Sequence, residues 1–250
     1  MKSLFIADLH LSPSRPDIAR AFNAFLEGLP EGIDKLFILG DLFEIWIGDD
    51  DPSDFAQSII QSIRRVSDSG IQTYFQGGNR DFMIGRQFCE QAGCQRLPDF
   101  LVQNIHGHKI LLTHGDLLCT DDLAYQRYRR RIQFPPTTWV VRRLPLKTRQ
   151  KLGARIRSVS LEKAQNKSEN IMDVNADEVI SRLKAFDCQI MIHGHTHRPK
   201  VHEIEMLEKP AKRFTLGDWG SHVWWVQVDS DNIELRSQPC LLYTSDAADE

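Results

Sequence analysis

Short apolar runs alternate along the chain with segments of helical periodicity. Nearly continuous apolar runs lie at 3–8, 35–41, 71–76, 109–114 and 188–193. Runs of this length are typical of strands that are buried on both faces. Helix-compatible segments follow the first two runs, at about 17–29 and 55–67. The alternation predicts an α/β fold with layers of helices against sheets.

The C-terminal part of the core is expected to be all β. The segment from about 201 to 236 contains Val223-Trp-Trp-Val-Gln-Val and Ile233-Glu-Leu, which alternate as strands do. We therefore predict a terminal β-meander there.

The middle of the chain, from about 120 to 175, has no strand pattern. Its apolar residues recur at helical spacing, and Pro135, Pro136 and Pro145 are expected to divide it into short helices. We predict a core at 1–120 and 175–239 and a helical cap inserted at 121–174. Residues 240–250 continue no pattern and are expected to be an extraneous tail.

Charge is unevenly distributed although the totals, 31 basic and 34 acidic residues, nearly balance. From Arg127 to Arg157 there are eleven Lys or Arg residues and no Asp or Glu, which leaves 20 basic and 34 acidic residues elsewhere. A basic stretch on an acidic body favours a local anionic partner, namely a nucleotide, nucleic acid or anionic lipid. A solvated helical face would have the same composition, so that alternative stays open.

Features near the N-terminus and the number of cysteines indicate the cellular compartment of the protein. Asp8 and His10 occur too early for a secretory signal, and no apolar run approaches the roughly 18 residues of a membrane helix. The five cysteines are an odd number without a CxxC pair. These features predict a protein of the reducing cytoplasm.

Potential ligands lie where the expected strands end. The chemistry-bearing segments are Asp8-Leu-His10, Gly40-Asp41, Gly78-Asn79-Arg80-Asp81, His114-Gly115-Asp116 and His193-Gly194-His195-Thr196-His197. In open α/β sheets, sites form outside the carboxyl ends of the strands. We therefore expect these five segments to meet.

The donor types indicate a metal site. Carboxylate, imidazole and Asn carbonyl groups suit Mn²⁺, Fe²⁺ or Zn²⁺, and the absence of cysteine argues against a structural zinc site. The candidates are too many for one ion but fit two ions if one carboxylate bridges them. Two such ions clamp the oxygens of an in-line phosphoryl displacement and acidify a water between them. The candidate ligands are Asp8, His10, Asp41, Asn79, His114, His195 and His197.

This ordered set resembles the motifs of the calcineurin-like metallophosphoesterase superfamily. Longer segments resemble its UDP-2,3-diacylglucosamine pyrophosphatase family, the lipid A pathway hydrolases of Gram-negative bacteria, over about residues 1–238. The segments are 8–11, 40–51, 78–82, 114–122, 171–175 and 193–199. The resemblance implies a layered α–β–β–α sandwich with a helical cap between core strands.

The resemblance also implies residue roles. Two Mn²⁺ ions are expected, with Asp41 bridging them. One ion would be held by Asp8, His10, Asp41 and His197, and the other by Asp41, Asn79, His114 and His195. The implied catalytic residues are Asp41, Asn79, Arg80, His114 and His195. The implied substrate contacts are Asn79, Arg80, Asp122, Ser160, Lys167 and His195.

Two positions depart from the usual patterns. Arg80 stands where most superfamily members have His, and it offers a permanently charged, forked phosphate clamp in place of an imidazole acid. Ala164 stands where the narrower family usually has Asn, so that contact falls to neighbouring Gln165 or Asn166 or is absent.

The implied reaction is hydrolysis of UDP-2,3-diacylglucosamine to UMP and 2,3-diacylglucosamine 1-phosphate, by attack of metal-activated water on the α-phosphorus. The cap would hold the acyl chains and contact the anionic cytoplasmic face of the inner membrane, with the protein peripherally associated there. Nucleic acid is not expected as a partner. The alternatives are a calcineurin-like phosphodiesterase or nuclease with another substrate, and a membrane-binding module with a vestigial metal site.

Overall fold

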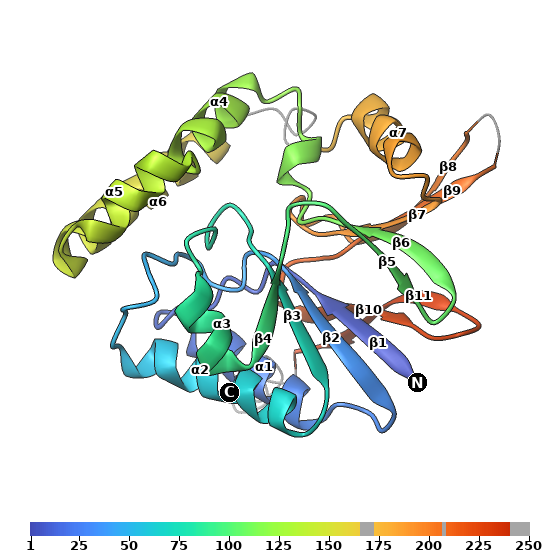
Figure 1. Cartoon of the computed structure of the whole chain (residues 1–250), viewed down its shortest axis with the longest axis horizontal. Coiled ribbons are helices and arrows are strands. Elements are labelled where there is room, and N and C mark those ends of the chain that lie inside the picture. Colours follow the sequence, from blue (N-terminus) through green and yellow to red (C-terminus); the bar gives the residue numbers. More distant parts are fainter. Residues whose placement is uncertain (166–172, 207–208, 241–250) are drawn as a thin grey trace, which may run out of the picture.

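The computed structural model describes residues 1–165, 173–206 and 209–240 of the chain. Two β-sheets stack face to face with helices on their outer faces, and a further group of helices extends beyond one edge of the stack (Figure 1). The expected layered α–β–β–α fold is therefore confirmed.

The first sheet carries the N-terminal strands. Its central strands β1 to β4 run parallel, and β10 and β11 add antiparallel strands beside β1. In spatial order the described strands are β11 (Ile233–Pro239), β10 (His222–Val228), β1 (Lys2–Ile6), β2 (Ile33–Leu39), β3 (Gln72–Gln76) and β4 (Cys94–Leu97).

The second sheet has a parallel centre between two antiparallel edges. Strands β6, β7 and β9 run parallel, while β5 and β8 pair antiparallel at the two sides. In spatial order the described strands are β5 (Leu101–Ile105), β6 (His108–Leu112), β7 (Ile190–His193), β9 (Ala211–Thr215) and β8 (Lys200–Ile204).

Three apolar cores explain why the strand sequences are almost continuously hydrophobic. In β1, Leu4 and Ile6 face the helices α1 (Pro16–Glu27), α2 (Asp54–Asp68) and α3 (Arg86–Ala92). The alternate residue Phe5 faces the second sheet, where it joins Ile110 and Ile192. Strands with both faces covered cannot show the polar alternation of a half-exposed strand.

The outer face of the second sheet is covered by α7 (Ala176–Ala185). Val179 and Leu183 of α7 pack on Leu111 and Met191, completing the fourth layer. Asn175 caps α7 by accepting a hydrogen bond from the Glu178 backbone N–H at 3.0 Å.

The expected terminal β-meander is wrong as a single unit. Its segment forms two antiparallel hairpins that belong to different sheets, β8–β9 in the second and β10–β11 in the first. After β9 the chain passes back to the first sheet, where β10 pairs with the edge of β1 and Val226 lies opposite Phe5. Strand alternation reports burial on a face but not the sheet to which that face belongs.

The middle segment is helical, as predicted. It forms α4 (Leu123–Ile132), α5 (Pro135–Arg143) and α6 (Leu146–Gln165), separated at the predicted prolines. The expectation of short helices is wrong for α6, which has 20 residues because no proline lies between Pro145 and Gln165. Asn175 donates to Asp121 at 3.0 Å, so the two ends of the predicted insertion lie side by side. We call α4–α6 the cap.

Several basic residues of the cap serve as anchors to the core. Arg149 is 3% exposed and donates to the Asp50 carboxylate and to the carbonyl oxygen of Ile47. Arg142 donates to the Met83 carbonyl oxygen at 3.3 Å. The uniform basic stretch therefore divides into residues that hold the cap and residues that face solvent.

Arg142 is exposed although it contacts the core, and the other exposed basic residues of the cap are Arg127, Arg130, Arg131, Arg143, Lys147, Lys151 and Arg155. No described helix is long and apolar enough to cross a membrane.

Candidate functional site

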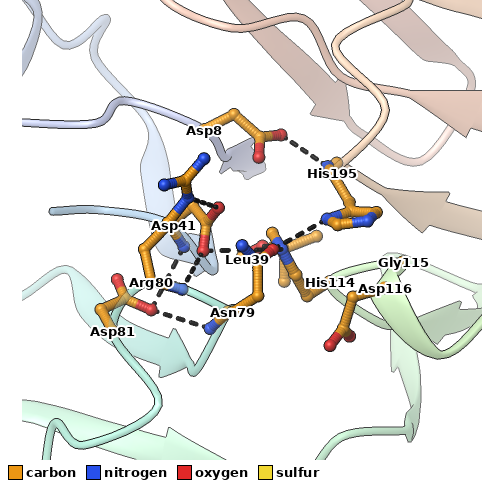
Figure 2. A network of polar contacts seen from close by, with 12 residues as sticks. Asp8, Leu39, Asp41, Asn79, Arg80, Asp81, His114, Gly115, Asp116 and His195 are labelled. Carbon is orange, nitrogen blue, oxygen red and sulfur yellow. Dashed lines mark hydrogen bonds and ion pairs between the residues drawn. The ribbon is translucent and has the colours of Figure 1, made fainter. Parts of the chain in front are cut away.

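Residues at the carboxyl ends of β1, β2, β3, β6 and β7 meet at one edge of the stacked sheets (Figure 2). The backbone there is unusual, because non-glycine residues adopt left-handed φ angles of 50–70°. Strained positions of this kind gather at functional sites, where surrounding contacts fix them. The site residues with these angles are Asp8, His10, Asp41, His195 and His197.

The first group of candidate ligands lies around Asp8. Nε2 of His197 is 3.5 Å from Oδ1 of Asp8 and 3.1 Å from Nε2 of His10. Oδ2 of Asp8 accepts the backbone N–H of His195 at 2.8 Å. Oδ1 of Asp8 is buried and has no hydrogen-bond partner within the described structure. This leaves one carboxylate oxygen aimed at two imidazoles.

The second group lies around Asn79. Its side-chain amide is 2.9 Å from Nδ1 of His195 and 3.1 Å from Nε2 of His114. Turned one way, the amide nitrogen donates to both rings and to Asp41. Turned the other way, its oxygen joins two ring nitrogens as a third metal donor. Asp41 adjoins this group, with Oδ1 3.6 Å from Nε2 of His114.

The orientation of His114 is fixed from behind. Its Nδ1–H donates to the carbonyl oxygen of Leu39 at 2.9 Å, which directs Nε2 into the site. A ring N–H bonded to a backbone carbonyl is the usual arrangement for a metal-ligating histidine.

Asp81 positions the two loops that carry Asp41 and Asn79. It is fully buried, and its carboxylate accepts the backbone N–H groups of Gly78 at 2.8 Å and Leu42 at 2.7 Å. The sequence motif contains Asp81, but the pattern alone does not distinguish this supporting role from a ligand role.

Two glycines let neighbouring loops approach the carboxylates. A Cβ on Gly78 would overlap Oδ1 of Asp41, and a Cβ on Gly194 would overlap Oδ2 of Asp8. Both glycines are therefore required by close approach.

Electrostatics in the site favour a cation. Burial and the neighbouring Asp81 and Asp8 carboxylates raise the pKa of Asp41 to about 7, against the opposing effect of His114. Burial lowers the pKa of His10 to about 3 and that of His195 to about 4, so both rings are neutral lone-pair donors at neutral pH.

The pKa of His114 is shifted in the opposite direction. Burial alone would lower its pKa, but the Asp41 and Asp8 carboxylates outweigh burial and raise it to about 9. A positive charge is thus favoured between these carboxylates, whether a proton or a metal ion supplies it.

Arg80 lies at the mouth of the site with its guanidinium beside two acids. Nε is 3.9 Å from Oδ2 of Asp41, and Nη1 is 3.7 Å from Oε1 of Glu44. Glu44 also forms an ion pair with Arg157 of α6 and lies 3.4 Å from Nδ1 of His10. The Glu44 carboxylate thus connects α6 of the cap with His10 of the first ligand group.

A second link joins the cap to the motif 114–116. Asp116 is buried and accepts from Tyr125 Oη at 2.7 Å and from Nε of Arg129 at 2.5 Å. The neighbouring charges of His114 and Arg129 lower the pKa of Asp116 despite its burial, which alone would raise it. The base of the cap is therefore tied to the loop that carries His114.

All seven sequence-predicted ligands are brought together. Asp122 lies at the base of the cap, where its carboxylate caps α4 by accepting the Tyr125 backbone N–H at 3.0 Å. Ser160 lies on α6, but its side chain and those of Ala164 and Gln165 are outside the described set. Lys167 and Asn166 lie outside the described residues.

Histidines outside the ligand set have other contacts. His193 is buried, with its Nε2 accepting from Arg213 at 3.2 Å. His106 lies near the opposite end of β1, where its Nε2 is 2.9 Å from Oγ of Ser3. Neither joins the metal-ligand groups.

The donor set fits two metal ions. Among the described residues, Asp8, His10 and His197 form one cluster of ligand atoms, and Asp8, Asp41 and His114 form a second. Asp8 belongs to both clusters, and Oδ2 of Asp41 in the second lies 4.0 Å from Nε2 of His10 in the first. Both placements suit carboxylates shared by neighbouring cations.

Comparison with known proteins agrees with this geometry. The model of the calcineurin-like phosphoesterase family matches residues 1–199. The chain belongs to this family of metal-dependent phosphoesterases.

Curated relatives of high sequence identity share one name. UDP-2,3-diacylglucosamine hydrolase of Marinobacter nauticus is 46% identical over 240 residues, which are 96% of this chain and 98% of that protein. The protein of the same name from Tolumonas auensis is 47% identical over the same shares of both chains. That from Pseudomonas aeruginosa is 47% identical over 92% of this chain and 96% of its own.

Proposed function

We propose that the chain hydrolyses the pyrophosphate bond of UDP-2,3-diacylglucosamine, giving UMP and 2,3-diacylglucosamine 1-phosphate in the lipid A pathway. The observation that carries this proposal is the similarity to hydrolases of that name at 46–47% identity over nearly the whole of both chains. The clustered ligands and the exposed apolar side chains of the cap support it.

We propose two Mn²⁺ ions as cofactors. The residues that would hold them are Asp8, His10, Asp41 and His197 at one position and Asp41, Asn79, His114 and His195 at the other. Bound there, the ions would supply Lewis-acid charge and a water of lowered pKa.

Arg80 acts on the pyrophosphate as a fixed positive clamp. Its guanidinium is held at the mouth by Glu44 and Asp41, so its N–H groups are oriented before substrate arrives. A guanidinium stays protonated at any working pH and binds phosphate oxygens through paired donors. Arg80 therefore orients the phosphoryl group and stabilises its charge without moving a proton.

Three further proposed substrate contacts come from the predicted insertion at 121–174. Asp122 stands at the start of α4, and Ser160 lies on α6, on the chain segments that flank the ligand loops. We propose that these two residues, with Lys167, contact the glucosamine part of the substrate.

The cap offers a surface for acyl chains and lipid. Large apolar side chains stand exposed there: Phe134 is 56% exposed, Trp139 57% and Val140 51%. The guanidinium of Arg143 lies 3.5 Å from the centre of the Trp139 ring. Exposed apolar residues beside basic ones are typical of helices at anionic membrane interfaces. We propose that this face meets the cytoplasmic surface of the inner membrane.

Binding to vesicles tests the membrane surface. Changing Arg143, Lys147 and Lys151 to Glu should reduce sedimentation with vesicles of phosphatidylethanolamine and phosphatidylglycerol, and added salt should reduce wild-type binding. A control with the same net charge changes exposed residues away from the cap, namely Lys109, Lys212 and Arg236. Equal binding by the two triple variants would contradict the proposed surface.

A parallel substrate assay tests the activity. The protein is incubated with UDP-2,3-diacylglucosamine, bis-p-nitrophenyl phosphate and DNA while Mn²⁺, Zn²⁺ and Mg²⁺ are varied. We expect release of UMP from the nucleotide sugar, fastest with Mn²⁺. Faster cleavage of DNA, or no release of UMP with any metal, would refute the proposed function.

A further inference from the structure

A cavity of about 320 Å³ lies beside the ligand groups. Its lining residues come from the loop after β7, from β8 and β9, and from the position three residues before α7. The polar and charged lining residues are Asp173, Thr196, Arg198, Lys200, His202 and Thr215. None of these residues is a candidate metal ligand.

The cavity shares a wall with the reaction site. Thr196 stands between His195 and His197 in the sequence, and Arg198 follows directly. One loop therefore carries ligands on one side and cavity residues on the other. A molecule with a phosphate at the metal positions could place its next group in this cavity.

One side of the cavity is formed by hydrogen-bonded polar side chains. Oγ1 of Thr215 lies 3.2 Å from Nε2 of His193, which also accepts from Arg213. Burial, with Arg213 nearby, lowers the pKa of His202, so its ring is neutral at neutral pH. These contacts hold this side in place without filling the cavity.

One polar atom in the wall is unsatisfied. Oγ1 of Thr196 is buried and has no hydrogen-bond partner within the part of the chain that the structure describes. A buried hydroxyl without a partner costs stability, so its presence beside a cavity points to a ligand that hydrogen-bonds with it. Asp173 adds a carboxylate oxygen 3.2 Å from Nη1 of Arg198, which places an acceptor beside a donor.

The cap and the cavity lie on different sides of the site. Helices α5 and α6 extend toward the side of α2 and α3, whereas β8 and β9 lie at the opposite side of the molecule (Figure 1). A substrate with an acylated sugar on one phosphate and a nucleoside on the other needs binding surfaces on two sides of the metal positions. The exposed apolar side chains of the cap suit the acyl chains, and the small cavity with its polar and charged side chains suits the remaining half.

We propose that this cavity is the subsite for the nucleoside half of the substrate, an inference that rests on the proposed function. Its volume lies at the lower end of ligand pockets, which suits a single nucleoside and excludes two acyl chains. Uracil presents carbonyl oxygens on both sides of an N–H group. Arg198 and Lys200 can donate to the carbonyl oxygens, while Asp173 and Thr196 can bond the N–H group or the ribose hydroxyls.

Inhibition by the two products separates the two halves of the substrate. In Thr196→Val and in Lys200→Ala, the inhibition constant of UMP should rise about tenfold, as for the loss of one hydrogen bond. The inhibition constant of 2,3-diacylglucosamine 1-phosphate and the turnover of bis-p-nitrophenyl phosphate should not change. Lys212→Ala on neighbouring β9 removes an exposed cation outside the cavity and should leave all three values unchanged.

Several outcomes would overturn the subsite. Unchanged inhibition by UMP in both cavity variants would show that the nucleoside binds elsewhere. Equal loss with UMP, with the lipid phosphate and with the small diester would show a structural role for the loop. Direct titration of UMP into the Mn²⁺-loaded wild type and variants tests the cavity even if UDP-2,3-diacylglucosamine is not cleaved, and that lack of cleavage would refute only the proposed function.

Discussion

Replacing Arg149 with alanine is expected to loosen the cap while leaving the core folded. The side chain of Arg149 is 2% exposed and joins α6 to the loop before α2. It donates to the carbonyl oxygens of Leu144 at 2.9 Å and Ile47 at 2.8 Å, and to the Asp50 carboxylate. Truncation removes all of these donors together.

The expected cost follows from those partners. Asp50 is 59% exposed, so water replaces its ion pair and that pair contributes only about 0–1 kcal/mol. The two half-buried carbonyl oxygens lose their donors at about 1 kcal/mol each. The docked cap should therefore lose about 2–3 kcal/mol, a roughly 30- to 150-fold shift toward its undocked form.

Amide hydrogen exchange measures this shift directly. Exchange in α5 and α6 should accelerate by the same factor, whereas amides of β1 and β2 should keep their rates. Lys147→Ala removes an exposed cation from the same helix and should change neither region. Unchanged exchange in α5 and α6, or equal acceleration throughout the core, would refute the role of Arg149 as an anchor.

The same anchor should depend on pH. Hydrogen bonding to Arg149 holds the pKa of Asp50 below its ordinary value of 3.8. A lowered pKa stabilises the docked cap above that value, and the stabilisation is lost as the pH falls through the lowered pKa. Exchange in α6, corrected for its intrinsic rate, should therefore accelerate below about pH 4 in the wild type. Arg149→Ala should lack this acceleration.

Three further substitutions or truncations test the site and the chain end. Asp41→Ala should abolish turnover and reduce bound metal, measured by elemental analysis; retention of both ions at a near-normal rate would contradict its bridging position. Arg80→Ala should slow turnover by several orders of magnitude without removing a pKa from the pH–rate profile, and loss of a pKa there would contradict the clamp. A chain ending at Cys240 should keep its melting temperature, because Cys240 is buried and its backbone N–H donates to the Ser221 carbonyl oxygen. A chain ending at Pro239 lacks this contact and should lose about 1 kcal/mol of unfolding free energy. Equal melting temperatures of the two chains would contradict the role of Cys240.

The sequence indicated the buried strands because burial on two faces leaves a plain apolar run. Strands β4 and β5 escaped this reasoning, since Gln95 and Arg96 in β4 and Gln103 and Asn104 in β5 interrupt the pattern. Local alternation likewise could not show that β8–β9 and β10–β11 join different sheets, because sheet membership depends on long-range pairing.

The candidate ligands were visible in the sequence because each follows a strand, but their support was not. Arg149 and Lys147 look alike in a basic stretch, yet only Arg149 is buried against an acid. The role of Asp81 depends on two backbone N–H groups that only the folded loops bring together. The expected tail included Cys240, which is buried in the core, and residues 241–250 lie outside the described structure.

The close approach of Gly78 to Asp41 and of Gly194 to Asp8 has a consequence for sequence change. Each glycine belongs to one motif but leaves room for the carboxylate of another motif far away along the chain. A side chain at position 194 would therefore displace Asp8 before it displaced the neighbouring His193 or His195. Transplanting one motif loop from a distant homologue should fail unless the loop that it touches is transplanted with it. A change in one of these loops should therefore require a matching change in the loop that it touches.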